Sequence, residues 1–168
     1  MRAIVFDTPG GPEVLAIGEV PPPRPGPGEL LVRVRAAGVN RADLLQRLGK
    51  YPPPPGASPI LGLEIAGEVA EAAGGWQRDD RVMAVVTGGG YAEYAVVPAD
   101  QALPIPPMFS FVQAAAIPEA FLTASLNLFT LGSLQSGEHV LIHAAASGVG
   151  SAAVQLAKRF GAVVHATA

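Results

Sequence analysis

The spacing of hydrophobic positions changes along the chain. Up to about residue 100, short apolar runs rich in Val, Ile, Leu and Ala alternate with turns rich in Gly and Pro. Such runs are typical of β-strands, and many of them in succession predict a compact, barrel-like β domain. The first two expected strands should form a hairpin with a long loop. The strands are expected at residues 2–7, 14–20, 30–39, 63–73, 81–86 and 91–97.

Helical patterns interrupt and then follow the strands. Asn40 is a suitable N-cap for a short helix at residues 41–48, which Gly49 should end. From about residue 106 the spacing becomes helical at residues 110–117 and 119–131. These helices are expected to connect the β domain to the C-terminal part of the chain.

The last thirty residues carry the pattern of a βαβ unit. An apolar run at residues 140–142 stops at a turn of small residues, 144–150, and helical spacing follows. Two basic residues suit the last turn of that helix, and Gly161 is a suitable C-terminal cap. Residues 162–168 should then form a second, parallel strand. The sequence therefore predicts an α/β fold with a β-rich first part.

The turn of this βαβ unit is a candidate phosphate site, because free backbone N–H groups at a helix start favour phosphate. On the dinucleotide fingerprint G-x-G-x-x-G, Ala145 and Ser147 replace the first two glycines, whereas Gly150 matches and Gly148 is additional. A βαβ unit that binds nothing is the alternative reading. The cofactor-binding candidates in the turn are Ala146, Ser147, Gly148, Val149 and Gly150.

Composition narrows the class of partner. The chain has 168 residues, 49% of them hydrophobic, a net charge of −3 and no cysteine. Disulfides and cysteine zinc sites are excluded, and the scattered basic residues suggest neither nucleic acid nor a membrane surface as partner. The proline-rich residues 21–28 fit either a stiff connector or a ligand for an aromatic groove. We expect a soluble, cytoplasmic protein that binds small molecules.

Four motifs in order resemble one family. Residues 38–58, 60–69, 114–124 and 140–150 read GVNRADLLQRLGKYPPPPGAS, ILGLEIAGEV, AAAIPEAFLTA and VLIHAAASGVG. They resemble the zinc-independent, zeta-crystallin-like quinone oxidoreductases of the medium-chain dehydrogenase/reductase superfamily, and YPPPPGAS is most similar to the tumour-suppressor-inducible subgroup. The resemblance implies two domains: a GroES-like β-barrel at residues 1–119, and connecting helices with the first βαβ unit of an incomplete Rossmann domain at residues 120–168.

The resemblance also implies a chemistry. Asn40 and Leu63 occupy positions where zinc-dependent relatives carry a cysteine and a histidine ligand, and leucine cannot bind zinc. The resemblance instead implies hydride transfer from a reduced nicotinamide to a quinone or similar conjugated carbonyl. Asn40 and Tyr51 match cleft positions and are the catalytic candidates, whereas Thr123 matches a position near the nicotinamide. Their alternative roles are a helix cap, a loop tyrosine and a helix-surface hydroxyl.

NADPH is the cofactor that the resemblance favours, and NADH stays open. The side chain that reads the ribose 2′ position usually lies about 20 residues past the glycine turn, and Ala168 comes before that point. The apolar strand at 140–142 also calls for cover on both faces. We therefore expect a truncated chain, a cleavage product or half of a split enzyme, paired as a homodimer or with a complementing C-terminal half. An inactive binding module and an enoyl reductase are the alternatives.

Overall fold

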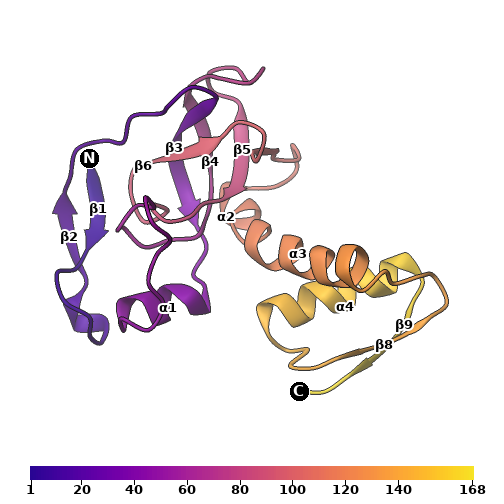
Figure 1. Cartoon of the computed structure of the whole chain (residues 1–168). Coiled ribbons are helices and arrows are strands. Elements are labelled where there is room, and N and C mark those ends of the chain that lie inside the picture. Colours follow the sequence, from indigo (N-terminus) through magenta and orange to yellow (C-terminus); the bar gives the residue numbers. More distant parts are fainter. The chain divides into compact units, whose positions relative to one another are not determined.

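The computed structural model describes residues 1–168. The chain divides into two compact units, Met1–Pro118 and Glu119–Ala168, which run from indigo to orange and from orange to yellow in Figure 1. Each unit has a hydrophobic core of its own. The units are therefore described one at a time.

The first unit is built around an antiparallel sheet of five strands, as the strand-rich sequence predicts. The sheet order is β6-β3-β4-β5-β7, and a separate hairpin of β1 and β2 confirms the expected pairing of the first two strands. A 3-10 helix at Pro12–Val14 occupies the start of the range expected for the second strand. The strands are β1 Arg2–Val5, β2 Ala16–Glu19, β3 Glu29–Ala37, β4 Glu64–Glu71, β5 Arg81–Val85, β6 Tyr94–Pro98 and β7 Leu103–Pro104.

Alternating side chains of these strands form the core of the first unit. Leu30 and Val32 on β3 pack with Ile65 and Val69 on β4, and all four are fully buried. Burial of one such side chain contributes about 1.5–3 kcal/mol. This core holds the two central strands in register and fixes the positions of the loops at their ends.

The turn before β5 departs in sequence from the pattern of the resembled family and holds a residue other than glycine at a positive φ. Where the resembled family has Gly-Asp-Arg-Val, this chain has Asp79 in place of glycine. Asp79 nevertheless adopts a left-handed φ of 68°, and its N–H donates to the Val69 carbonyl over 2.8 Å. The turn thus keeps the glycine conformation with a residue that tolerates it less well.

The helices near the unit boundary follow the predicted spacing in part. α2 (Phe111–Ala114) begins after Ser110, which caps it, and α3 (Pro118–Ser125) begins at a proline, as expected. The expected helix at 119–131 does not keep one hydrogen-bonding pattern, because Leu126–Leu131 is a π-helix. The helical stretch Phe111–Leu131 has 21 residues and a mean hydropathy of 1.3, which meets the length and composition of a membrane span; apolar helices of soluble proteins also meet them.

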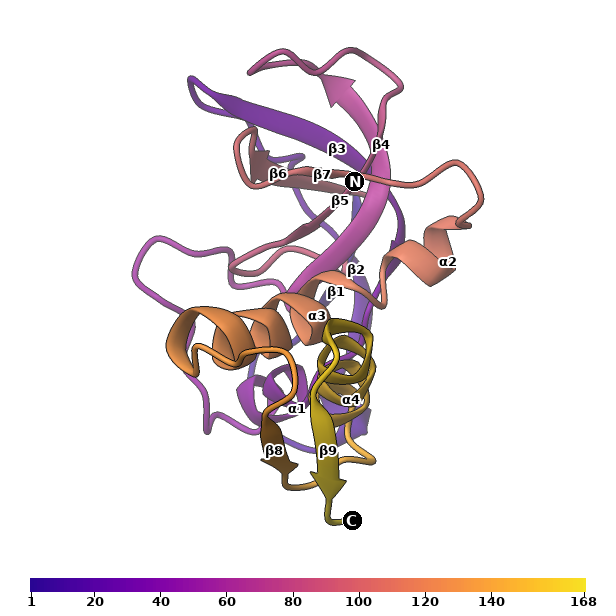
Figure 2. The same ribbon diagram turned by 90° about the vertical axis from the view of Figure 1, so that its right-hand side faces the viewer.

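The second unit contains the predicted βαβ arrangement. β8 (His139–Ile142) pairs in parallel with β9 (Val163–Ala166), and α4 (Gly148–Phe160) connects them. Figure 2 shows the two strands side by side and running in the same direction. Gly161 ends α4 with a left-handed φ of 93°, which confirms the predicted cap.

Only one face of this small sheet is covered within the chain. Ile142 is buried against Leu128 and Ala153, which lie in the π-helix and α4. On the opposite face Leu141 is 57% exposed. The consecutive apolar residues of β8 therefore pack against other residues on one side of the strand only.

Candidate active site

Asn40 is held at the start of the short helix α1 (Arg41–Arg47). Its side-chain Nδ2 donates to Glu64 Oε1 over 2.9 Å, and its backbone N–H donates to Asp43 Oδ2 over 2.7 Å. The amide group is thus fixed by a carboxylate from β4, while Asp43 satisfies a backbone donor at the helix start. This confirms the predicted N-cap and gives the Asn40 side chain a defined orientation.

Asp43 organises a hydrogen-bond network around its buried carboxylate. Besides the Asn40 N–H, this carboxylate accepts from the Gly62 N–H over 3.1 Å and from the Tyr91 hydroxyl over 2.8 Å. The Asp43 and Glu64 side chains belong to residues that are only 3% and 4% exposed. Buried carboxylates need such donors, because an unpaired one would lose its hydration without compensation. We call these five residues (Asn40, Asp43, Gly62, Glu64 and Tyr91) the Asp43 network.

Tyr91 acts in the Asp43 network as a hydrogen-bond donor. Burial raises the pKa of its hydroxyl well above the usual value, and the hydrogen bond to Asp43 and the charges of Asp43 and Glu64 raise it further. The phenol therefore keeps its proton. Gly62 completes the packing: its φ is 103°, and a Cβ there would lie 2.6 Å from the Tyr91 nitrogen.

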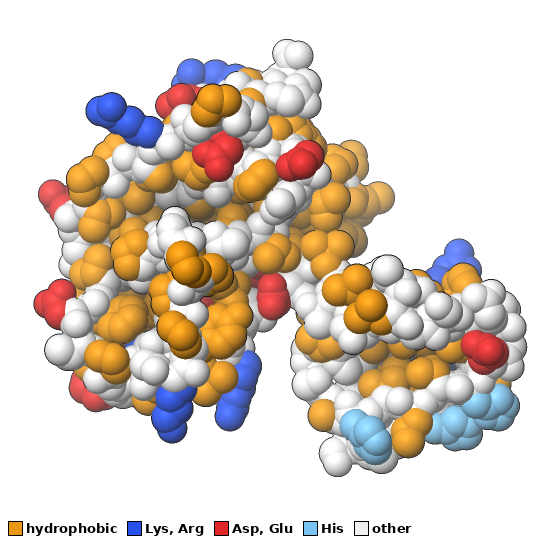
Figure 3. Space-filling model, viewed as in Figure 1, with side chains coloured by type: hydrophobic (Ala, Val, Ile, Leu, Met, Phe, Trp, Pro, Cys, Tyr) orange, Lys and Arg blue, Asp and Glu red, His pale blue; other side chains and the backbone are white.

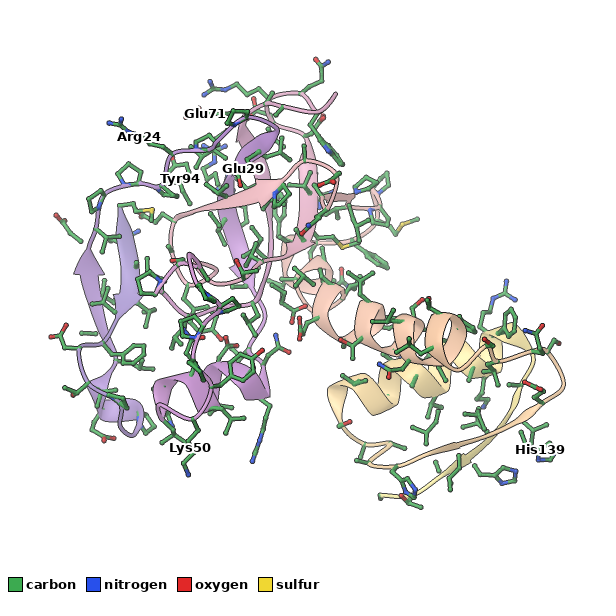
Figure 4. All side chains as sticks on the ribbon, viewed as in Figure 1. Arg24, Glu29, Lys50, Glu71, Tyr94 and His139 are labelled. Carbon is green, nitrogen blue, oxygen red and sulfur yellow. The ribbon has the colours of Figure 1, made fainter.

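Tyr51 lies in the proline-rich loop that follows α1. It is 44% exposed, its hydroxyl makes no hydrogen bond within the chain, and it is not part of the Asp43 network. Figure 4 shows the preceding residue, Lys50, pointing away from α1. The phenol of Tyr51 is therefore available to a bound molecule.

The start of α4 presents unpaired backbone donors. Ser147 is extended and caps the helix, with its Oγ accepting from the Gly150 N–H over 3.0 Å. The N–H groups of Gly148 and Val149 have no acceptor within the chain, as expected for the first turn of a helix. A Cβ at Gly148 would meet no atom within 4 Å, so the space beside this residue is open. These features suit a phosphate group, which N–H donors at a helix start attract.

Gly150 lets the helix approach the turn closely. A Cβ at this position would lie 2.3 Å from the Ala144 carbonyl oxygen and 2.7 Å from the Ala145 Cα. The left-handed residue of the turn is Ala144, with φ of 51°. Ala145, at the first glycine of the fingerprint, therefore needs no glycine in this chain.

The remaining candidates lie nearby in sequence. Ala146 is exposed immediately before Ser147, and Thr123 is half-buried in α3, where its carbonyl accepts from Asn127 Nδ2 over 2.8 Å. Thr123 and residues 146–150 belong to the second unit. Asn40 and Tyr51 belong to the first unit, so each unit carries one group of candidates.

Sequence reasoning missed Asp43 and Tyr91. Asp43 follows Asn40 by three residues, which is the spacing of a capping box, and this spacing could have indicated Asp43 from the sequence. No sequence signal connects Tyr91 to Asp43, because 48 residues separate them. Among residues 1–168, no group of three or more His, Asp or Glu side chains is placed to hold a metal ion.

A separate cavity of about 670 Å³ lies in the first unit. Its lining includes Phe6 after β1, Tyr94 on β6 and Arg24 in the proline-rich segment, and none of the predicted site residues lines it. Figure 4 labels Arg24 and Tyr94 in this region. The cavity is therefore distinct from the Asp43 network.

Residues 26–107 match the sequence model of the alcohol dehydrogenase GroES-like domain family. The chain contains a GroES-like domain. The five-stranded sheet and the Asp43 network both lie within this GroES-like domain.

Similar proteins extend the likeness beyond the GroES-like domain. The chain is 40% identical over 163 residues to the human synaptic vesicle membrane protein VAT-1 homolog, covering 94% of the chain and 42% of that protein. A quinone oxidoreductase from Thermus thermophilus, described with its NADPH complex, is 40% identical with a TM-score of 0.81, over 99% of this chain and 52% of that one. The CurK enoyl reductase is 32% identical with a TM-score of 0.91, over 99% and 54%.

These likenesses support membership of the medium-chain dehydrogenase/reductase superfamily, and two of the similar proteins are a quinone oxidoreductase and an enoyl reductase by description. They also confirm the predicted fold class, a GroES-like β domain followed by a βαβ unit. The chain spans about two fifths of the length of the curated relative and about half that of the solved structures.

Proposed function

We propose that the protein takes part in the NADPH-dependent reduction of a quinone or a similar conjugated carbonyl without zinc, as in the zinc-independent quinone oxidoreductase branch. The observation that carries this proposal is the start of α4, where the Gly148 and Val149 N–H groups have no acceptor within the chain and the space beside Gly148 is open. Support also comes from the likeness to a quinone oxidoreductase described with its NADPH complex.

The α4 turn fits a dinucleotide pyrophosphate. Gly148 and Val149 would donate their N–H groups to its oxygens, while the Ser147 hydroxyl keeps a proton to donate, since its Oγ accepts from Gly150. Ala146 would border the same phosphate, and Thr123 would lie toward the nicotinamide. When bound, the reduced nicotinamide supplies the hydride.

Asn40 and Tyr51 would orient the reacting molecules. Glu64 holds the Asn40 side-chain amide and Asp43 holds the Asn40 backbone N–H, so the amide can present a hydrogen bond without first becoming ordered. Tyr51 would contribute a free phenol to the cofactor or to a quinone oxygen. Hydride transfer needs no metal here, and Leu63 and the absence of cysteine remove the usual zinc ligands.

Substitution of Gly148 tests the cofactor site directly. Gly148→Pro removes one phosphate-facing N–H, and the fold accepts proline because residue 148 is the first helical position and Ser147 is extended. We expect NADPH affinity, measured by fluorescence titration, to fall about tenfold or more, the equivalent of one charge-assisted hydrogen bond. Gly148→Ala is the matched control, because it keeps the N–H. Equal affinities in the two variants would remove the α4 turn from the site.

A substrate panel distinguishes the candidate activities. NADPH oxidation by the 168-residue chain, alone and with a separately expressed C-terminal half of a relative, is measured with a quinone and with a 2-enoyl thioester. The thioester is included because the fold closely matches an enoyl reductase. Quinone turnover supports the proposal, and thioester turnover alone supports enoyl reduction. A folded chain without activity under either condition would indicate a binding module.

Cofactor preference, location and assembly stay predictions. NADPH is expected to bind more tightly than NADH, which the same titration measures. A cytoplasmic location is expected, together with a homodimer or a complementing C-terminal half.

A further inference from the structure

The outward face of the β8–β9 sheet carries two of the three histidines of the chain, His139 and His165, and His143 follows directly after β8. Val140 and Ile142 on β8 point into the core of the second unit, so the alternating residues His139 and Leu141 point outward and are exposed. On β9, His165 is exposed on the same side. Figure 3 shows the pale-blue histidine side chains gathered on one face of this unit.

Two of these histidines face each other across the strands. His139 Nδ1 and His165 Nε2 are 2.9 Å apart. The strand register pairs His139 with Val163 and His165 with Leu141, so the two imidazoles are diagonal neighbours on a fixed backbone. Figure 4 shows the His139 side chain pointing out from β8.

The geometry aligns the two nitrogen atoms. The ring centroids are 5.2 Å apart and the planes differ by 20°. The distance between His139 Nδ1 and His165 Nε2 is about 2.3 Å shorter than the distance between the ring centroids. This difference is close to the sum of the two distances from a ring centroid to its nitrogen. Each nitrogen therefore points along the line that joins the rings. One of them must carry the proton and the other must accept it.

The same alignment suits a metal ion in place of that proton. We propose that His139 and His165 bind one divalent first-row transition-metal ion, Cu²⁺ most tightly, with water in the remaining positions. Two opposed imidazoles fit trans positions of a tetragonal Cu²⁺ or Ni²⁺ centre better than the tetrahedral angle of Zn²⁺. Metal–nitrogen bonds of about 2.0–2.1 Å need the two nitrogens to separate by roughly 1.2 Å more. Exposed side chains accommodate this by small rotations.

The titratable side chains of Glu138 and His143, close to the His139–His165 pair, have hydrogen-bond partners of their own. The carboxylate of Glu138, which precedes His139, accepts from the Gln135 N–H over 2.8 Å. His143 is occupied elsewhere, with its Nδ1 3.0 Å from Thr167 Oγ1. Because the two ligands come from different strands, the bound ion would fasten β8 to β9, and its binding free energy would add to the stability of the second unit.

The test is a Cu²⁺ titration of the tag-free chain, followed by calorimetry and visible absorption. Loss of even an outer-shell partner weakens metal binding about 10- to 100-fold, so His139→Ala and His165→Ala should each weaken it by at least about tenfold. His143→Ala is the matched control and should keep the parent affinity. Affinity should decrease from Cu²⁺ to Ni²⁺ to Zn²⁺.

Thermal unfolding supplies a second readout. Cu²⁺ should raise the Tm of the parent chain and of His143→Ala, but not that of His139→Ala or His165→Ala. The proposal is overturned if the doubly substituted chain binds Cu²⁺ as tightly as the parent, or if only one of the two histidines matters. Neither outcome bears on NADPH binding, which the Gly148 variants test separately.

Discussion

Tyr91 lies in the Asp43 network and Tyr51 lies outside it, so substitutions of these two tyrosines should change stability by different amounts. Tyr91 donates to a buried carboxylate, whereas the Tyr51 hydroxyl has no partner within the chain. Tyr91→Phe should therefore lower the free energy of unfolding by about 1.5–3 kcal/mol, the contribution of a hydrogen bond to a charged group. Urea denaturation measures this loss.

Tyr51→Phe is the control for that experiment. As an exposed change away from the core, it should alter stability by no more than about 0.5 kcal/mol. In a complete enzyme it should instead change quinone kinetics or cofactor affinity. Equal destabilisation by the two substitutions would contradict the Asp43 network.

Asp79 offers a test of backbone strain. Its φ of 68° favours glycine, and its 3.9 Å contact with Arg33 is exposed. Asp79→Gly and Asp79→Ala both remove that contact, so their difference reports the backbone alone. The glycine variant should be more stable than the alanine variant by about 1 kcal/mol, because a left-handed conformation costs an L-residue roughly 1–2 kcal/mol. Thermal unfolding of the pair measures it, and alanine being equal or better would argue against the strained turn.

At the scale of elements, the joint between β8 and α4 depends on one glycine. Gly150→Ala would place a methyl group 2.3 Å from the Ala144 carbonyl oxygen, so backbone must move. We expect a loss of about 1–3 kcal/mol, as for overpacking in a well-packed interior. Gly148→Ala, two residues earlier with open space around it, should be neutral or stabilising. Denaturant midpoints of the two variants separate packing from helix propensity.

Elements with a strong periodic signal could be predicted from the sequence, and the others could not. The cap residues Asn40 and Gly161 and the parallel pairing of β8 with β9 follow from local chemistry. β7 has only two residues, and the π-helix at Leu126–Leu131 has the same apolar spacing as an α-helix. Neither leaves a pattern that periodicity can detect.

The Asp43 network escaped prediction for a different reason. Its members come from the start of α1, from Gly62, from β4 and from Tyr91, and only the folded sheet brings them together. The short local spacing from Asn40 to Asp43 was readable, but the long-range contacts were not. For the same reason, the sequence indicated Asn40 and Tyr51 as separate candidates but did not indicate the residues that surround them.

Across the whole molecule, stability is expected to be uneven. β3 and β4 lie inside a five-stranded sheet with fully buried side chains, whereas β8 and β9 form a two-stranded sheet with Leu141 exposed. Amide hydrogen exchange should therefore be faster in β8 and β9 than in β3 and β4 by at least about tenfold, because opening free energies follow burial. Uniform protection over both units would show that they open together.

The burial and the hydrogen bond that keep Tyr91 protonated also set an alkaline limit on the fold. The pKa of its hydroxyl is raised above the ordinary 10.0, chiefly by burial and then by Asp43. Its contribution is therefore fully present below pH 10.0 and is lost as the pH rises toward the higher folded pKa. Above pH 10.0, unfolding releases a proton from this phenol. High pH thus destabilises the folded chain through one half-buried side chain, Tyr91, whose only hydroxyl proton is donated to Asp43.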